Sequence, residues 1–201
     1  MIYRTIYLND IIKNFGKETA KEVLSDFSCP LNKDVEVFAH KKAIDFEIAG
    51  ISRTYLVVAQ EGEEIHGICA LYSIAPKSLY IEGNFSAARK RKLFGTTFTV
   101  GNPINAILIG QLSKNFKNGR DKYITGEILM SLIVDCIKKV DILIPSVSVY
   151  VECEDNEKIR RYYERFGFEL LGKNEDKDLL RYLIPTRTFT NPEYKKKYYK
   201  K

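Results

Sequence analysis

The sequence lacks the runs and motifs that mark exported, membrane-spanning and metal-binding proteins. No apolar run approaches the roughly 20 residues that a helix needs to cross a membrane. The N-terminal residues 1–13 mix charged with apolar side chains, and they contain neither the continuous apolar segment nor the cleavage site of a signal peptide. The 4 cysteines are far apart and include no CxxC pair, which argues against a metal or redox site. We therefore expect a cytoplasmic protein with reduced, mostly buried thiols.

The composition is typical of a soluble globular protein with one core. The 201 residues are enough for one well-buried core and few for two independent domains. A hydrophobic fraction of 45% and a charged fraction of 29% are ordinary for such a protein. There is no internal repeat, and the only biased segment is the Lys/Tyr-rich C-terminus. We expect a single domain over residues 1–185 and a solvated tail over residues 186–201.

The net charge of +6 is a weak indication of an anionic partner. The expected tail contributes most of the excess, because residues 195–201 read KKKYYKK. A second basic cluster, ARKRK at residues 88–92, lies inside an irregular, partly basic segment over residues 76–104. It fits a solvated helix face after the cap residue Ser86 and also a nucleic-acid patch. The charge therefore allows an anionic partner without identifying it.

Hydrophobic periodicity predicts an alternation of helices and strands. A helix is expected over residues 32–49, with Asn32 as its N-cap and Gly50 at its end. The later elements are an antiparallel hairpin of strands 55–60 and 65–75, a short helix 86–94, a strand 105–113, a helix 127–140, a strand 146–152, a helix after Asn156 and a closing hairpin over 168–185. Because strand, helix and strand follow one another between residues 105 and 152, we expect a βαβ unit with parallel strands in a mixed sheet.

Motif residues occur at the ends of these predicted helices. A polar loop ends in Thr125-Gly126 at the start of the predicted helix 127–140. The predicted helix after residue 156 has an asparagine at its start and a Tyr-x-x-x-Gly-Phe signature at its end; the motif residues are Asn156, Ile159, Tyr163, Gly167 and Phe168. With the strand ILIGQLS, these residues resemble the core of the GNAT superfamily of N-acetyltransferases, over about residues 54–184. More loosely, residues 27–44 and 51–58 resemble the entry region of a bacterial GNAT subgroup that includes toxins acetylating aminoacyl-tRNA.

The resemblance implies an α/β fold: a GNAT-like mixed, twisted β-sheet flanked by helices and splayed between two central parallel strands. It implies an enzyme that transfers an acetyl group from acetyl-CoA, its cosubstrate, to an amine, with no metal. Three alternatives stay open: a toxin-like enzyme acting on an RNA-linked amine such as aminoacyl-tRNA, an enzyme acting on a small-molecule or protein amine, and a catalytically degenerate GNAT binding module. The toxin-like alternative adds tRNA and an antitoxin as partners, and the family analogy adds a homodimer. No membrane partner is expected.

The resemblance also assigns cosubstrate-binding residues to the loop before the predicted helix 127–140. The family's pyrophosphate loop reads Gln/Arg-x-x-Gly-x-Gly/Ala, and this chain has Asp121 and Ile124 at two of those positions. Backbone N–H groups and the positive end of a helix dipole can still hold an anion there. The predicted cosubstrate-binding residues are Leu112 and Ser113 on the strand, Lys117, Arg120 and Lys122 in the loop, Thr125, Gly126 and Glu127 at the helix start, and Asn156.

The resemblance assigns the catalytic acid to Tyr163. A phenol with a reference pKa of about 10 is protonated at neutral pH and can give a proton to a departing thiolate. Tyr162, rotated by about 100° on the same helix, is expected to pack in the core. Glu152, at the end of a strand, is the predicted general base, although an α-amine with a pKa near 8 needs no strong base. The alternative for Tyr163 is a core tyrosine with a satisfied hydroxyl.

Overall fold

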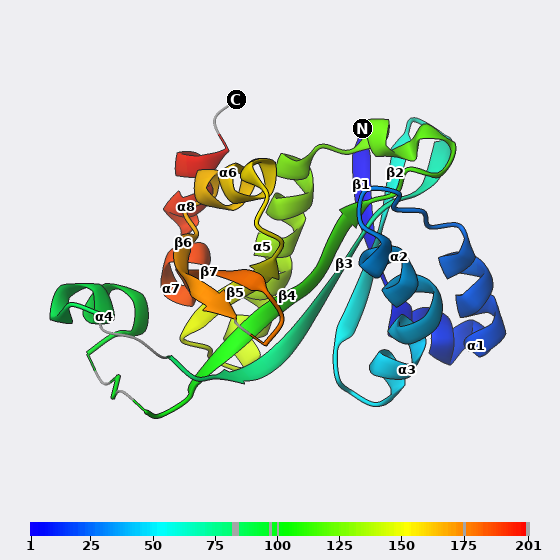
Figure 1. Ribbon diagram of the computed structural model, residues 1–201. Helices are drawn as coiled ribbons and strands as arrows, with labels where there is room; N and C mark the ends of the chain where they lie inside the picture. Colours follow the sequence, from blue (N-terminus) through cyan, green and yellow to red (C-terminus); the bar gives the residue numbers. More distant parts are fainter. Residues whose placement is uncertain (82–84, 97, 100, 175, 200–201) are drawn as a thin grey trace. The chain divides into compact units, whose positions relative to one another are not determined.

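The computed structural model describes residues 1–81, 85–96, 98–99, 101–174 and 176–199 (Figure 1). Its sheet has 7 strands in the order β1-β2-β3-β4-β5-β7-β6. The strands are β1 (Ile2–Tyr7), β2 (Arg53–Glu61), β3 (Glu64–Leu79), β4 (Ile104–Lys114), β5 (Ser148–Cys153), β6 (Glu169–Asn174) and β7 (Leu179–Pro185). β4 and β5 are parallel, whereas β1–β2, β2–β3, β5–β7 and β6–β7 are antiparallel. The predicted mixed α/β sheet is therefore confirmed.

Helices connect and flank these strands. They are α1 (Leu8–Ser25), α2 (Lys33–Val37), the π-helical turn η1 (Phe38–Lys42), α3 (Ala43–Ile48), α4 (Ala87–Phe94), the 3-10 segment η2 (Lys117–Tyr123), α5 (Gly126–Leu143), α6 (Glu157–Arg165), α7 (Thr186–Phe189) and α8 (Pro192–Tyr198). The chain divides into two compact units: Met1–Ala75 with Gly110–Ile133, and Pro76–Ile109 with Val134–Lys201. Each unit is described separately below, and the single-domain prediction stays a prediction.

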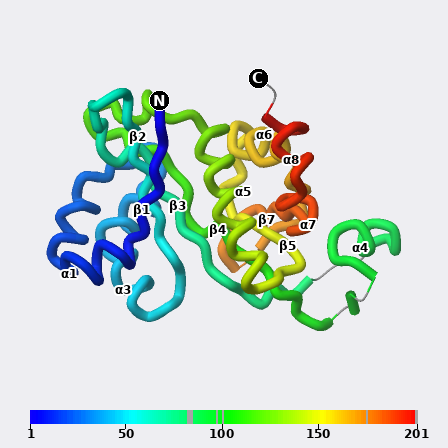
Figure 2. The backbone as a smooth tube through the Cα atoms, turned by 180° about the vertical axis from the view of Figure 1, so that it is seen from behind, coloured from blue at the N-terminus to red at the C-terminus, as the bar shows by residue number. Residues whose placement is uncertain are grey.

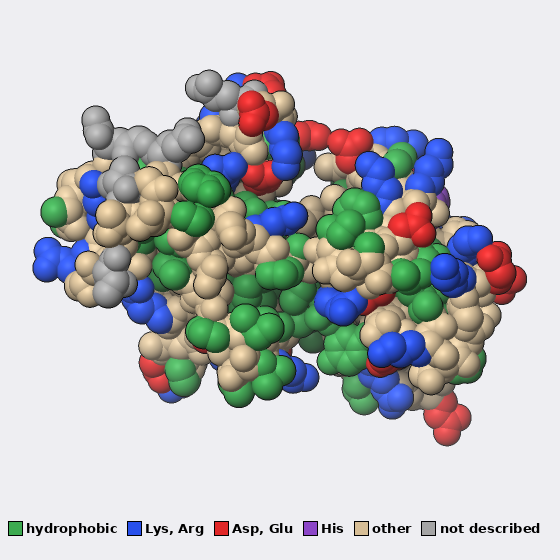
Figure 3. All heavy atoms as spheres, turned by 90° about the horizontal axis from the view of Figure 1, so that it is seen from below, with side chains coloured by type: hydrophobic (Ala, Val, Ile, Leu, Met, Phe, Trp, Pro, Cys, Tyr) green, Lys and Arg blue, Asp and Glu red, His purple; other side chains and the backbone are tan. Residues whose placement is uncertain are grey.

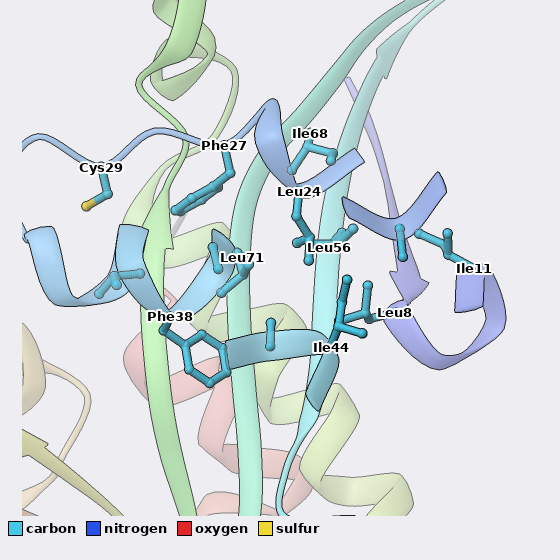
Figure 4. Packing of buried hydrophobic residues seen from close by; sticks show 14 residues of the cluster. Leu8, Ile11, Leu24, Phe27, Cys29, Phe38, Ile44, Leu56, Ile68 and Leu71 are labelled. Carbon is cyan, nitrogen blue, oxygen red and sulfur yellow. The ribbon is translucent and has the colours of Figure 1, made fainter. Parts of the chain in front are cut away.

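The first unit contains the N-terminal helices and the β1–β2–β3 part of the sheet. α1 and α3 lie beside β1 and β2, as the view from behind shows (Figure 2). Their apolar faces form one buried cluster with the strands (Figure 4). Its largest members include Leu8, Leu24, Phe27, Phe38, Leu56 and Leu71. Burial of such side chains is the main force that stabilises this unit, because each contributes about 1.5–3 kcal/mol.

The helical segment predicted over residues 32–49 is confirmed, with a π-helical turn inside it. Asn32 caps α2 because its side-chain oxygen accepts hydrogen bonds from the backbone N–H groups of Asp34 and Val35, at 3.0 and 3.3 Å. At the other end, Gly50 has a φ of +70°, in the left-handed region that favours glycine. Cap and stop signals are local, which is why the sequence reveals them.

The second unit contains β5, β6 and β7 with α4, α6, α7 and α8. β5 pairs with β7 from Ser148↔Pro185 to Cys153↔Leu180. α4 begins after Ser86, as predicted, because the Ser86 hydroxyl accepts a 3.3 Å hydrogen bond from the Arg89 N–H. The buried cluster under α4 includes Leu79, Leu93, Phe94, Ile104, Tyr150 and Leu183. The basic helix is thus part of a packed core, although residues 82–84, 97 and 100 of the surrounding segment lie outside the described residues.

The C-terminal segment corrects the prediction of a solvated tail. Residues 192–198 form α8, in which Tyr194 is 3% exposed, and Phe189 in α7 is fully buried. The Lys195 ammonium forms a 2.7 Å ion pair with Asp135. The prediction weighed the lysines, which lie mostly on the surface, and overlooked the aromatic residues between them, which pack inward.

Candidate active site

The pairing of β4 with β5 stops before either strand ends. The parallel register runs from Ala106↔Ser148 to Ile109↔Val151, while β4 continues to Lys114 and β5 to Cys153. The predicted splay of the two central strands is therefore confirmed. Where a strand extends beyond its pairing with a neighbour, its backbone N–H and C=O groups can form hydrogen bonds with a ligand. The candidate site is described as two sets of residues, one in each unit.

In the first unit, Leu112 and Ser113 lie on the extension of β4, as predicted. The Ser113 hydroxyl is 3.0 Å from the Cys29 sulfur and donates a 2.9 Å hydrogen bond to the Lys114 carbonyl. Its side chain therefore has partners within its own unit. A cosubstrate role for this stretch would rest on the backbone of residues 110–114.

The loop after β4 leads into the start of α5. Asn118 and Gly119 have φ angles of +56° and +70°, so the loop turns sharply before the helix. The Thr125 hydroxyl accepts a 3.2 Å hydrogen bond from the Ile128 N–H, and the Thr125 carbonyl accepts one of 3.0 Å from the Leu129 N–H. Thr125 is thus the N-cap, and Gly126 and Glu127 begin the helix at the predicted positions. The positive end of the α5 dipole lies at these residues.

Two of the three predicted loop cations are bound to Asp26. Lys117 Nζ lies 3.2 Å from Asp26 Oδ1 and donates a 3.1 Å hydrogen bond to the Ser25 carbonyl, and Arg120 forms an ion pair with Asp26 Oδ2. Burial would raise the pKa of Asp26, but the hydrogen bonds and charges of these two cations outweigh it and lower that pKa. Lys122 is exposed. The loop is therefore less positive than its sequence indicates.

Sequence reasoning missed Asn115, which is fully buried at the end of β4. Its amide nitrogen donates to the carbonyls of Asp26 and Ile68, at 2.7 and 2.8 Å. Its amide oxygen accepts from the N–H groups of Ser28 and Lys117, at 2.9 and 3.0 Å. One side chain thus fixes the start of the loop to β3 and to residues 26–28. The available signal was a polar residue directly after an apolar strand.

Tyr123 fixes the other end of the same loop. Its ring stacks on His66 with centroids 3.9 Å apart, and its carbonyl accepts a 2.9 Å hydrogen bond from the Tyr3 hydroxyl. Next to His66, Gly67 has a φ of +77°, and a Cβ there would lie 3.1 Å from the Arg120 guanidinium carbon. The loop is therefore held against β1 and β3 before any ligand binds.

In the second unit, the end of α6 forms a Schellman motif that explains the Tyr-x-x-x-Gly-Phe signature. Gly167 has a φ of +79°, and its N–H donates to the Glu164 carbonyl at 2.9 Å. The Phe168 N–H donates to the Tyr163 carbonyl at 3.2 Å, and the two rings touch with centroids 5.6 Å apart. These are the hydrogen bonds and the apolar contact of the motif. Tyr163 therefore occupies a structurally defined position in the last turn of the helix.

Tyr163 is 8% exposed, and its ring packs among other aromatic rings. Its centroid lies 5.3 Å from that of Tyr162 and 6.2 Å from that of Tyr182. Burial raises the pKa of Tyr163 well above its ordinary value, so the hydroxyl is protonated at neutral pH. Within the described part of the chain, that hydroxyl has no hydrogen-bond partner. Tyr162 is half-buried, and its ring contacts Phe166 at 5.1 Å.

Glu152 is engaged in ion pairs at the end of β5. Its carboxylate accepts hydrogen bonds from Asn174 at 2.9 Å, from Lys177 at 3.0 Å and from Arg181 at 2.9 Å. Burial would raise the pKa of Glu152, but the hydrogen bonds that it accepts outweigh burial and lower that pKa. A carboxylate with this environment is a weak proton acceptor, so these contacts favour a structural role in the β5–β7–β6 sheet over a role as general base.

Asn156 is the N-cap of α6. Its side-chain oxygen accepts a 2.9 Å hydrogen bond from the Lys158 N–H. Its predicted contact with the cosubstrate stays a prediction. The described residues contain no group of three or more His, Cys, Asp or Glu side chains placed to hold a metal ion. Nor do they include a helix that is both long and apolar enough to span a membrane.

Solved structures with the same fold exist, although no family model and no curated protein matches the chain. A tyrosine-to-phenylalanine mutant of KacT superposes with a TM-score of 0.66 at 15% identity, covering 94% of this chain and 98% of that one. AtaT complexed with acetyl-methionyl-tRNAfMet gives a TM-score of 0.64 at 17% identity, with coverages of 93% and 96%. AtaTR bound with acetyl-CoA gives 0.63 at 14% identity, with coverages of 93% and 95%. The predicted likeness to toxin GNAT proteins is therefore confirmed for the fold, over nearly the whole of each chain.

Proposed function

We propose that this protein is an acetyl-CoA-dependent N-acetyltransferase that acts on the amine of an aminoacyl-tRNA. The observation that carries the proposal is the Schellman end of α6, which fixes the protonated, buried Tyr163 next to Gly167 and Phe168. The splayed pairing of β4 and β5 supports it. So does the fold shared with AtaT, which has been solved with acetyl-methionyl-tRNAfMet.

The chemistry assigned to Tyr163 is proton donation to the leaving group. The neutral amine attacks the thioester carbon, a tetrahedral intermediate forms, and the C–S bond breaks as the thiolate takes the Tyr163 hydroxyl proton. The amine loses its own proton to solvent. A phenol whose pKa is raised by burial is fully protonated at neutral pH and so holds the proton that the thiolate needs. The phenolate left after the transfer takes up a proton from solvent, which balances the one that the amine releases.

The anion of the cosubstrate is assigned to the start of α5. This 18-residue helix begins at Gly126, so the positive end of its dipole lies there. Lys122 is the exposed cation of the loop. Lys117 and Arg120 hold the loop to Asp26 and are therefore assigned to shaping the site rather than to direct phosphate contact.

The acceptor is assigned to RNA because of the surface around α4. The Arg89 guanidinium donates a 2.7 Å hydrogen bond to the Leu170 carbonyl, and Lys92 pairs with Glu169, so the helix is anchored by two of its cations. In the described part of the chain, Lys90 and Arg91 form no ion pair. Figure 3 shows Lys and Arg side chains on the surface of this part of the molecule. Cations on a rigid helix suit a phosphate backbone.

The test is an acceptor screen with acetyl-CoA and the purified protein. Release of free CoA thiol is measured with aminoacyl-tRNAs, free amino acids, small amines and peptides, and the acetylated product is identified by mass spectrometry. The proposal requires acetylation of an aminoacyl-tRNA and no comparable rate with the free amino acid. Acetylation of only small or peptide amines would replace the acceptor, and failure to bind acetyl-CoA at all would favour a binding module.

The binding-module alternative is favoured by one observation, the pairing of Lys117 and Arg120 with Asp26. In that case acetyl-CoA affinity, measured by calorimetry, would be weak or absent. Asp26→Asn would then restore it by releasing both cations. An enzyme that already binds acetyl-CoA tightly through the α5 N-terminus would gain little from the same change.

A further inference from the structure

The C-terminal helix α8 packs directly on the end of α6. The Tyr194 hydroxyl donates a 2.7 Å hydrogen bond to the Phe166 carbonyl, and Tyr194 is 3% exposed. The Tyr199 ring lies 5.4 Å from the Phe166 ring. A Cβ on Gly167 would come within 2.4 Å of the Tyr198 hydroxyl, so the absence of a side chain at Gly167 makes room for α8. Two consecutive residues of the α6 end, Phe166 and Gly167, thus meet aromatic residues of the C-terminal segment.

Backbone hydrogen bonds connect these contacts with Tyr163. The Tyr163 carbonyl accepts hydrogen bonds from the Phe166 N–H at 3.0 Å and the Phe168 N–H at 3.2 Å. Phe166 thus donates its N–H to Tyr163, while its carbonyl accepts the hydrogen bond from Tyr194. A parallel route runs through side chains, because the Phe168 ring contacts Tyr163 on one side, at 5.6 Å, and Phe189 on the other, at 5.6 Å.

A helix end whose carbonyl is hydrogen-bonded by a buried side chain is more rigid than one whose carbonyl is hydrogen-bonded by water. The last carbonyls of a helix have no partner within it, and water usually supplies one. Here a buried phenol is the partner, and α8 has a second anchor, the 2.7 Å ion pair of Lys195 with Asp135 on α5. Any displacement of α8 therefore alters the turn that holds Tyr163.

We propose that α8 is a positioning element for Tyr163, acting through the Tyr194 hydrogen bond to the Phe166 carbonyl. The inference rests on the proposed function, because it assumes that the Tyr163 hydroxyl reacts. Catalytic geometry is sensitive at this scale, since a shift of about 1 Å can cost about 10²-fold in rate. Tyr194 itself touches no reacting atom.

The kinetic test compares Tyr194→Phe with Thr190→Val in the full-length protein. Thr190 lies just before α8, and its hydroxyl donates to the Thr186 carbonyl at 2.9 Å and to Asp141 at 3.5 Å, so the control deletes a hydroxyl with no partner on α6. We expect Tyr194→Phe to lower kcat by about tenfold with the KM for acetyl-CoA changed less than about twofold, and Thr190→Val to change neither. An unchanged kcat in Tyr194→Phe, or an equal loss in both variants, would overturn the inference.

A double mutant separates positioning from general damage. If Tyr194 acts through the Tyr163 hydroxyl, adding Tyr194→Phe to Tyr163→Phe should lower kcat no further, because the group being positioned is gone. A loss that multiplies with the Tyr163→Phe loss would show that Tyr194 acts on stability or on another step. That outcome would contradict the positioning role.

Amide hydrogen exchange tests the same contact without activity. Tyr194→Phe should speed exchange of the Phe166, Gly167 and Phe168 amides several-fold, because one bond of the turn is lost, while Thr190→Val should leave them unchanged. Unchanged exchange in Tyr194→Phe would refute the mechanical link. An inactive wild-type protein would refute the proposed function alone, and the exchange result would still decide whether α8 holds the α6 end.

Discussion

Two glycines that end helices in the same way provide a measurable comparison. Gly167 ends α6 and Gly50 ends α3, each with a positive φ, +79° and +70°. Each N–H bonds back to the helix, Gly167 to the Glu164 carbonyl at 2.9 Å and Gly50 to the Glu47 carbonyl at 3.3 Å. A Cβ at Gly50 meets nothing within 4 Å, whereas at Gly167 it meets the Tyr198 ring. Only the second substitution should therefore disturb α8.

The expected losses follow from these two environments. Gly50→Ala should cost about 1–2 kcal/mol, the strain of an alanine in the left-handed region. Gly167→Ala should cost that amount and, in addition, displace the Tyr198 ring, whose contact with Tyr194 at 4.7 Å contributes about 0.5–1.5 kcal/mol. For a chain of this size each kcal/mol lowers Tm by about 2–4 °C.

The assay is unfolding followed by far-ultraviolet circular dichroism, by heat and by urea. Gly167→Ala should have the lower free energy of unfolding and a reduced turnover, and Gly50→Ala should keep wild-type turnover. Equal losses of stability in the two variants would refute the placement of Tyr198 against Gly167. Wild-type turnover in Gly167→Ala would argue that the α6 end tolerates displacement.

Three further predictions concern the helix dipole, acid stability and RNA binding. Gly126→Asp should leave the fold intact, because an acidic residue suits a helix start, and should abolish acetyl-CoA binding in calorimetry; unchanged affinity would mean that the loop is misassigned. Glu36 pairs with Lys33 and accepts hydrogen bonds from Cys29 and Ser28, and these contacts lower its pKa from 4.5 to about 2. Its contribution is present above the ordinary pKa and lost as pH falls toward the lowered one, so the Tm difference between wild type and Glu36→Gln should shrink from about pH 5 to about pH 2; a constant difference would contradict it. Arg91→Ala should reduce the salt dependence of tRNA binding by about one unit of log-log slope, with Lys139→Ala on α5 as the charge-matched control; equal slopes in both would remove α4 from the RNA surface.

The sequence revealed the parts of the site that depend on local geometry. Asn156 is the N-cap of α6, and Gly167 and Phe168 form the Schellman motif at its end. Both features depend on hydrogen bonds between residues that are a few positions apart in the chain. The parallel pairing of β4 with β5 also follows from the hydrophobic pattern, because the βαβ order allows few arrangements. The splay was expected from the family resemblance. The same reasoning placed Thr125 correctly as the start of α5.

The missing parts depend on contacts between residues far apart in the chain. Asp26 and Arg120 are 94 residues apart, and neither carries a local sign that they form an ion pair. Asn115 reads as a loop residue until its four hydrogen bonds are seen. The edge strand β1 has mostly exposed side chains and so no clear alternation. In the C-terminal segment, the many lysines led to the prediction of a solvated tail, and the aromatic residues that pack on α6 were overlooked.

In the proposed mechanism, the Tyr163 hydroxyl gives its proton to the departing thiolate. This step is tested most directly by single-turnover acetyl transfer with Tyr163→Phe and, as the matched control, Tyr162→Phe. Phenylalanine keeps the ring contacts of Tyr163 with Phe168 and Tyr182 and deletes only the proton donor. We expect near-normal acetyl-CoA affinity for both variants and a chemical step about 10²- to 10⁴-fold slower for Tyr163→Phe alone. An undiminished single-turnover rate in Tyr163→Phe would make Tyr163 a packing residue and assign the proton to water or another donor.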